Sequence, residues 1–220
     1  PIWNQRQPDP SALRPQDDNK REVTMTSPFD EHCMRAALAQ ARRGLGRVGH
    51  ARPSVGCVLV KQGRIIAAAR TGDGGAPHAE VAALRMAGAE AKGATAYVTL
   101  EPCAHHGKTP PCTGALIAAG IQRCVIACID PFDPVNGEGA RQLKIAGVQV
   151  EVGLLEKEAK ALNQGFFLNV MEKRPMVTLK CSTTADSKIT LGEKNKDWIT
   201  GDLARRHAHF ERSMHDTILA

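Results

Sequence analysis

Apolar residues recur along this chain in two ways, at the three-to-four-residue spacing of a helix face and in the short runs of a strand. The first pattern predicts helices over residues 30–43, 79–91, 113–119, 139–146, 154–170 and 202–212. The second predicts strands over residues 55–60, 65–69, 95–100, 125–129, 148–152, 176–181 and 217–220. Up to residue 170 the order is α-β-β-α-β-α-β-α-β-α. This order predicts an α/β fold with a mixed sheet and helices on both faces.

The same pattern indicates where folded units begin and end. Residues 1–24 show no hydrophobic period and are rich in Pro, Gln, Asn and Asp. Residues 1–25 are therefore predicted to be a disordered leader or tag, with Met25 as the natural start. Because Pro175 opens a new unit, we predict one domain over residues 26–173 and a second unit over residues 174–220.

Composition excludes several classes of protein. Of the 220 residues, 42% are apolar and 24% charged, which is ordinary for a globular protein and excludes wholesale disorder, collagen and coiled coil. The sequence holds neither an apolar run of about 18 residues nor a signal peptide. We therefore expect a cytoplasmic protein without a membrane partner.

The net charge of +6 permits an anionic partner, but aromatic residues make up only 4% of the chain. This scarcity argues against a stacking platform for single-stranded nucleic acid. A phosphorylated small molecule fits the same positive surplus, and no nucleic-acid partner is expected.

Four residues form a pattern typical of a metal site. His78 and Glu80 stand at the start of one predicted helix, Cys103 follows a predicted strand, and Cys112 lies nine residues further on. One His and two Cys suit Zn²⁺ and leave the fourth tetrahedral position for water, which is a catalytic arrangement. Glu80 is then placed to move a proton between that water and a leaving group.

Seven cysteines in a chain without a secretory signal predict reduced thiols rather than a disulfide framework. The five outside the metal pattern lie in apolar segments and are predicted to fill the core: Cys33, Cys57, Cys124, Cys128 and Cys181.

Two segments carry a family resemblance, PHAEV at residues 77–81 and LEPCAHHGKTPPC at residues 100–112. Their His-x-Glu…Pro-Cys…Cys order resembles the zinc-dependent nucleobase deaminases, whose signature has two residues between the cysteines. Here eight residues separate Cys103 from Cys112. The longer loop resembles the deaminase of riboflavin biosynthesis. Further matching segments occur between Asp30 and the C-terminus, among them VGCV at residues 55–58 and LNQGF at residues 162–166.

This resemblance implies a bifunctional enzyme, which we expect to be at least a dimer. In this family, a cytidine-deaminase-like α-β-α sandwich hydrolyses the amino group of 2,5-diamino-6-ribosylamino-4(3H)-pyrimidinone 5′-phosphate, and the resemblance implies the same fold and reaction here. The start of an α/β domain similar to dihydrofolate reductase follows, and the complete reductase uses NADPH. The resemblance implies that His78, Cys103 and Cys112 bind the zinc, and that Glu80 moves the proton.

The resemblance also implies substrate contacts. His105 and Lys108 match family positions that contact the substrate and its phosphate. Arg52 stands where the family has Asn, so it either holds a phosphate in place of the amide or indicates a different pyrimidine. Thr71 and Phe132 depart from the family pattern as well. These departures bear on the substrate and leave the zinc chemistry as expected.

In the second unit, the resemblance implies that Trp198 lies at the nicotinamide-cofactor site and Arg212 at the ribose phosphate. About 46 residues from Pro175 onward are too few to close a second core. We therefore expect a truncated reductase fragment without reductase activity, and NADPH binding only in a complete reductase domain.

Two other functions compete with this one. A zinc deaminase of another pyrimidine, a nucleoside or a tRNA base would favour the two-residue cysteine spacing, and a nucleic-acid substrate would favour a broader basic surface. An inactive binding scaffold would be expected to have lost a ligand or the glutamate, whereas all four residues are present.

Overall fold

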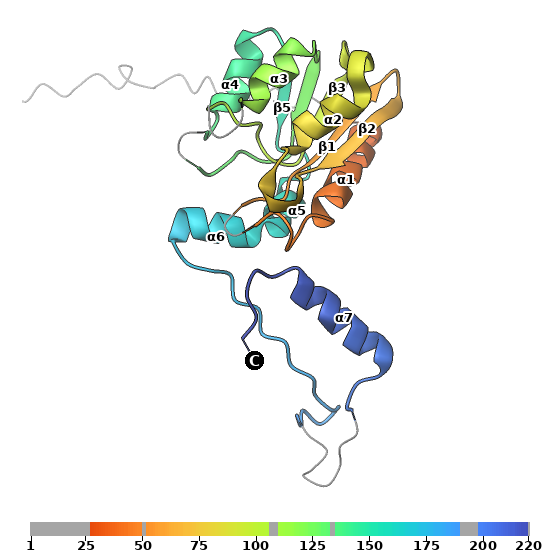
Figure 1. The fold of residues 1–220 in the computed structure, drawn as a ribbon, viewed down its shortest axis with the longest axis vertical. Coiled ribbons are helices and arrows are strands. Elements are labelled where there is room, and N and C mark those ends of the chain that lie inside the picture. The colour runs from red at the N-terminus through yellow and green to blue at the C-terminus, as the bar shows by residue number, and fades with distance from the viewer. Residues whose placement is uncertain (1–26, 50–51, 106–109, 133–134, 190–197, 220) are drawn as a thin grey trace, which may run out of the picture.

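A computed structural model describes residues 27–49, 52–105, 110–132, 135–189 and 198–219 of the chain. Its centre is a five-stranded sheet of order β2-β1-β3-β4-β5 (Figure 1). The strands are β1 Gly56–Lys61, β2 Arg64–Arg70, β3 Thr95–Val98, β4 Arg123–Ile126 and β5 Gln149–Val152. Strand β1 is antiparallel to β2 and β3, whereas β3, β4 and β5 are parallel. The prediction of a mixed sheet is confirmed.

Helices cover both faces of this sheet, as the sequence pattern predicts (Figure 1). The helices are α1 Pro28–Arg42, α2 Ala79–Ala87, α3 Cys112–Ala118, α4 Glu138–Ile145, α5 Glu156–Leu162, α6 Gln164–Glu172 and α7 Asp202–Ser213. Of these, α1 to α5 bury side chains against the sheet. Two short 3₁₀ helices, Asp73–Gly75 and Gly88–Ala91, flank α2. Among the described residues, no helix is long and apolar enough to cross a membrane.

The alternation of side chains along β1 divides the core into two clusters. Cys57 and Leu59 point to the face covered by α2, α3 and α4, whereas Val58 and Val60 point to the face covered by α1 and α5. Both sides of the strand are therefore buried, which explains its nearly continuous apolar run. The predicted core role of Cys57 is confirmed, as are those of Cys33, Cys124 and Cys128.

Helix α1 begins at a capping box, because the Ser27 hydroxyl accepts from the Asp30 N–H and the Asp30 carboxylate accepts from the Ser27 N–H. The same carboxylate accepts hydrogen bonds from Tyr97 Oη and Arg123 Nη1, at 2.6 and 2.7 Å. Arg123 also pairs with Glu151 at 2.7 Å. This network ties α1 to β3, β4 and β5.

One predicted helix, over residues 154–170, is wrong as a single element. The structure breaks it at Asn163 (φ −106°, ψ 26°) into α5 and α6. The Asn163 side chain accepts from the Ser54 N–H at 2.8 Å and donates to the Ser54 carbonyl at 3.0 Å. These two hydrogen bonds to a distant loop hold Asn163 out of helical geometry, although the apolar residues around it keep a continuous helical spacing. Similarly, the helix predicted over residues 79–91 ends earlier, where Gly88 takes a positive φ.

The strands predicted over residues 176–181 and 217–220 are also wrong, because residues 176–181 and 217–219 form no strand. No neighbouring strand pairs with them, and Val177 and Leu179 are 84% and 85% exposed. Cys181 is exposed too, so its predicted core role is wrong. The helix predicted over residues 202–212 is confirmed as α7, whereas the predicted leader, residues 1–25, lies outside the described residues.

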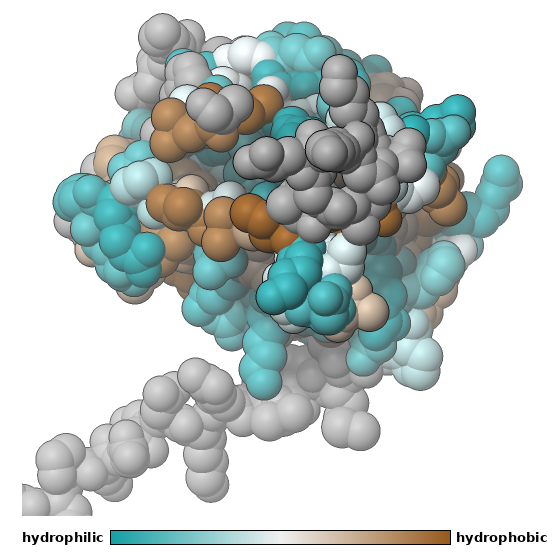
Figure 2. Space-filling view, turned by 90° about the horizontal axis from the view of Figure 1, so that it is seen from below, coloured by the Kyte–Doolittle hydropathy of each residue, from teal (hydrophilic) through white to brown (hydrophobic). Residues whose placement is uncertain are grey.

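The segment after α6 leaves much of its apolar surface uncovered. Figure 2 shows hydrophobic side chains gathered on the face seen from below, the side on which this segment lies in Figure 1. The segment's most exposed apolar residues include Val177, Leu179, Ile189, Trp198 and Leu203. The segment comes close to the rest of the chain at Gly46, where an added Cβ would lie 1.9 Å from the Ser213 carbonyl oxygen.

Candidate metal centre

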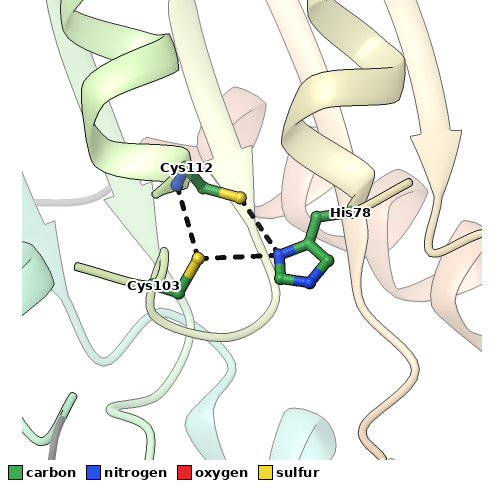
Figure 3. Close-up of side chains that lie close together, drawn as sticks. All are labelled: His78, Cys103 and Cys112. Atoms are coloured by element: carbon green, nitrogen blue, oxygen red, sulfur yellow. Dashed lines mark hydrogen bonds between the residues drawn. The ribbon is translucent and has the colours of Figure 1, made fainter. Parts of the chain in front are cut away.

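Three side chains from separate elements converge at one end of the sheet (Figure 3). His78 is the N-cap of α2, Cys103 lies in the turn that follows β3, and Cys112 is the first residue of α3. Their ligand atoms all lie within 4.8 Å of one another. His78 Nδ1 is 3.2 Å from Cys112 Sγ and 3.6 Å from Cys103 Sγ. The structure thus brings together the three residues that the sequence pattern singled out.

The surroundings of these side chains favour a thiolate. Hydrogen bonds from the Cys112 thiol, from His78 and from the Cys112 backbone N–H lower the pKa of Cys103 to about 4, although burial opposes this shift. The hydrogen bond that the Cys112 thiol makes with Cys103, together with burial, raises the pKa of Cys112. Cys103, beside the first turn of α3, is therefore the cysteine whose surroundings most favour the thiolate form that binds a metal ion.

An imidazole nitrogen and two cysteine sulfurs at this separation are a donor set that suits Zn²⁺. Within the part of the chain that the structure describes, no other group of three His, Cys, Asp or Glu side chains lies this close together. Three protein ligands leave one position of a tetrahedral ion open, as a catalytic zinc requires.

Glu80 lies next to the three side chains. It is in the first turn of α2, only 3% exposed, and its carboxylate accepts a hydrogen bond from the Cys112 thiol. Burial, with a smaller contribution from the charge of Cys103, raises the pKa of Glu80 to about 7. A carboxyl group with this pKa takes up and releases a proton near neutral pH, as general acid–base catalysis requires.

Arg52 lies at one rim of the site. Its Nη1 donates to the Gly74 carbonyl oxygen in the loop before α2. Gly75, at φ +90°, passes so close that an added Cβ would lie 2.5 Å from the same nitrogen. The hydrogen bond with Cys103 raises the pKa of His78, and the positive charge of Arg52 acts against that shift. The guanidinium is thus close enough to act electrostatically on His78, one of the three candidate metal-binding side chains.

His105 and Phe132 lie at another rim. Their ring centroids are 6.1 Å apart and their planes are tilted by 58°. Asp130 lies beside them, and burial raises its pKa to about 6, while the charge of His105 acts in the opposite direction. Lys108, the other predicted phosphate contact, lies outside the described residues.

The remaining singled-out residues lie elsewhere. Thr71 is buried, and its hydroxyl accepts the Val55 N–H at 3.0 Å, so it secures the start of β1. Trp198 is 74% exposed, and the Arg205 guanidinium lies 5.0 Å from its ring centroid. Arg212 is exposed near the end of α7, which Figure 1 shows apart from α2 and α3. The structure does not bring Trp198 or Arg212 to the three ligands.

Sequence reasoning missed Glu101, two residues before Cys103. It is 3% exposed, and its carboxylate accepts backbone N–H groups from Asp130, Gly137 and Ala140. An acidic residue directly at the end of a buried strand was the one available signal, because carboxylates are almost never fully buried unless paired.

The comparisons with known proteins agree with this geometry. The family described as the cytidine and deoxycytidylate deaminase zinc-binding region matches residues 27–128. Riboflavin biosynthesis protein RibD of Aquifex aeolicus is 45% identical over 188 residues, which are 86% of this chain and 52% of that protein.

Two solved structures resemble the chain closely. RibD of Acinetobacter baumannii is 44% identical with a TM-score of 0.76, over 84% of this chain and 52% of that chain. A diaminohydroxyphosphoribosylaminopyrimidine deaminase/5-amino-6-(5-phosphoribosylamino)uracil reductase of Thermotoga maritima is 43% identical with a TM-score of 0.77, over 84% and 53% respectively. The chain thus spans about half the length of the relatives it matches.

The mixed sheet, the His-Cys-Cys cluster and the matched zinc-binding region define a domain of the zinc-dependent, cytidine-deaminase-like class. More particularly, the chain is a homologue of RibD, the deaminase–reductase of riboflavin biosynthesis. The family resemblance that the two sequence motifs predicted is thereby confirmed.

Proposed function

We propose that this chain catalyses the hydrolytic deamination of 2,5-diamino-6-ribosylamino-4(3H)-pyrimidinone 5′-phosphate. Water replaces the amino group, and the products are 5-amino-6-(5-phosphoribosylamino)uracil and ammonia. The observation that carries the proposal is the convergence of His78, Cys103 and Cys112 in front of the buried Glu80 carboxylate. Homology to RibD supports the choice of substrate.

Each residue of the site has a distinct task in this reaction. His78, Cys103 and Cys112 would hold the zinc, which when bound would supply a Lewis acid that activates water for attack. The Glu80 carboxylate accepts a proton from the attacking water and delivers it to the departing amino group. Because Glu80 is buried beneath the ligands, bulk water does not compete for that proton.

The rim residues bind the substrate in this proposal. The Arg52 guanidinium, with its planar fork of N–H donors, is suited to a phosphate or to a ring carbonyl. His105 and Lys108 belong to the segment between the two cysteines, and we assign them contacts with the substrate and its phosphate. The position of Arg52 beside Gly74 and near His78 supports its part in this assignment.

We assign the deaminase activity to residues 26–173 and regard residues 174–220 as the start of a reductase domain. No reductase activity is proposed for the chain as it stands. In a complete reductase domain, Trp198 would contact NADPH and Arg212 the ribose phosphate. Support comes from the described part of this segment, where α7 is the only helix and Trp198 is 74% exposed.

The proposed enzyme is cytoplasmic, forms a homo-oligomer and acts on a small molecule rather than on nucleic acid. All seven cysteines are unpaired, which suits a reducing compartment. Exposed apolar side chains on the helices, such as Met86 at 65% and Ile145 at 71%, support contacts between copies of the chain.

Ammonia release by the zinc-loaded chain tests the proposed function. We expect turnover of the phosphorylated substrate and a loss of at least about tenfold in kcat/KM when its phosphate is removed. Arg52→Gln should weaken the preference for the phosphorylated form, whereas Arg85→Gln, at an exposed arginine of α2, should not. Faster turnover of cytidine or of a tRNA than of the phosphorylated pyrimidine would refute the substrate assignment.

A further inference from the structure

Glu101 is a buried acidic residue that the proposed chemistry does not use. It follows β3 and precedes the Pro102–Cys103 turn, and it is 3% exposed. Its Oε2 accepts the N–H groups of Asp130 at 3.2 Å and Gly137 at 2.9 Å, and its Oε1 accepts the Ala140 N–H at 2.9 Å. A buried carboxylate is tolerated only with such a full set of donors.

Asp130 and Gly137 belong to the connection between β4 and α4, and Ala140 lies in the first turn of α4. Gly139, also in the first turn of α4, packs against the turn that carries Cys103, because an added Cβ would lie 2.1 Å from the Pro102 carbonyl oxygen. The Glu101 backbone N–H donates to the Cys128 carbonyl at 3.0 Å. The connection is therefore fixed to the turn that carries Cys103 by backbone contacts and by one carboxylate.

The anchored connection carries one side of the candidate substrate rim. The Asp130 side chain accepts the Phe132 N–H at 2.9 Å, and the Phe132 ring packs against His105. His105 in turn lies two residues after Cys103. One carboxylate thus links a candidate metal ligand to both rings of this rim without itself joining the three ligand side chains.

We propose that Glu101 is a positioning residue of the deaminase reaction. Its carboxylate fixes the segments 130–132 and 135–140 and thereby holds the Phe132 and His105 rings where the pyrimidine binds. This inference rests on the proposed function for its link to substrate. The anchoring itself does not depend on the identity of that substrate.

Glu101→Gln isolates the effect of the carboxylate. The amide keeps one acceptor oxygen and replaces the other with an NH₂ group, which faces a backbone N–H that needs an acceptor. The connection should then loosen, while His78, Cys103 and Cys112 remain in place. Glu138→Gln is the matched control, because Glu138 lies in the first turn of α4 with its carboxylate bonded to Arg141 and Gln142.

The full zinc-loaded chain is compared in three measurements: zinc content, hydrogen–deuterium exchange of peptides covering residues 127–141, and the separate values of kcat and KM. For Glu101→Gln we expect one zinc per chain, faster exchange in that segment, and a KM raised at least about tenfold with kcat within about threefold. Glu138→Gln should match the wild type in all three.

Unchanged exchange in Glu101→Gln would overturn the anchoring, and a fall in kcat at unchanged KM would overturn the link to substrate binding. If Glu101→Gln does not fold, Phe132→Ala tests the same rim at a residue that is 45% exposed. An unchanged KM in Phe132→Ala would also overturn the proposal. A wild-type chain that releases no ammonia refutes the proposed function instead, and the exchange comparison still decides whether Glu101 anchors the segment.

Discussion

Leu143 of α4 and Leu203 of α7 both belong to amphipathic helices, yet Leu143 is fully buried and Leu203 is 82% exposed. The first belongs to residues 28–172, where helices cover both faces of the sheet. The second belongs to residues 174–189 and 198–219, where α7 is the only helix among the described residues. A periodic pattern therefore predicts which side of a helix is apolar, but burial needs a second surface.

The same difference separates the candidate site residues. His78, Glu80 and Cys112 stand at the starts of α2 and α3, which bury side chains in the core cluster on one face of the sheet, so their positions are fixed. Trp198 and Arg212 are exposed on the second segment, which meets the first across a cavity of about 360 Å³. Chemistry that needs fixed geometry is therefore assigned to residues 28–172.

The largest expected effect is on the rate of deamination, and it compares a site residue of the first region, Glu80, with one of the second, Trp198. Glu80→Gln should lower ammonia release by about a thousandfold with one zinc still bound, because it removes the group that moves the proton. Trp198→Ala should leave the rate within about twofold, since deamination makes no use of that side chain. Rates and zinc content are measured together, and near-wild-type activity of Glu80→Gln would contradict the assignment.

A pair of leucine substitutions compares the packing of the two regions directly. Leu143→Ala should lower the free energy of unfolding by about 3 kcal/mol, because it leaves a cavity among buried side chains. Leu203→Ala should change it by less than about 0.5 kcal/mol. Urea unfolding of both variants gives the two values. Equal losses would mean that α7 is packed as tightly as α4.

Acid should destabilise the first region through Asp30. Burial raises the pKa of this carboxyl, but hydrogen bonds from Arg123, Tyr97 and Ser27 outweigh burial and hold it well below its ordinary range. The depressed pKa stabilises the fold above the unfolded-state value of about 3.9, and this contribution is lost as the pH falls from there toward the folded-state pKa.

Asp30→Asn should therefore cost about 2 kcal/mol at pH 7 and clearly less at pH 3, where the wild type has itself lost part of the contribution. Urea midpoints of both proteins at the two pH values give the comparison. A difference that stays constant from pH 7 to pH 3 would exclude the ion pair with Arg123 as its source.

The smallest expected effect comes from removing the second segment. A chain ending at Lys173 should unfold within about 2 °C of the full chain, because few apolar side chains of the segment are buried against the sheet-bearing part. Thermal unfolding followed by circular dichroism measures this. A fall of more than about 5 °C would show that the second segment's contacts with the sheet-bearing part, among them the approach of Ser213 to Gly46, stabilise the whole chain.

The sequence predicted the sheet well, because the apolar runs of its strands are short and bounded by turns. It failed at Asn163, where two hydrogen bonds to Ser54 break a continuous helical period. It failed again over residues 176–181, where a strand pattern has no strand to pair with. In both cases the outcome depends on whether a segment distant in the sequence supplies a partner, and local periodicity carries no information about that.

The candidate metal cluster was predictable because the residue types themselves indicate the chemistry, and elements that start or end at one end of the sheet bring such residues together. Glu101 was missed for the opposite reason. Its partners are the backbone N–H groups of Asp130, Gly137 and Ala140, which every residue type except proline carries. Side-chain patterns do not reveal such anchoring.

X-ray absorption at the zinc edge of the full chain tests the central claim most directly. The account predicts one zinc per chain with two sulfur ligands at about 2.3 Å and two lighter ligands at about 2.0–2.1 Å, one of them His78. His78→Ala should remove the histidine signature while both sulfurs remain. A zinc bound by four sulfurs, or a chain that binds no zinc, would contradict the assignment of a catalytic site to His78, Cys103 and Cys112.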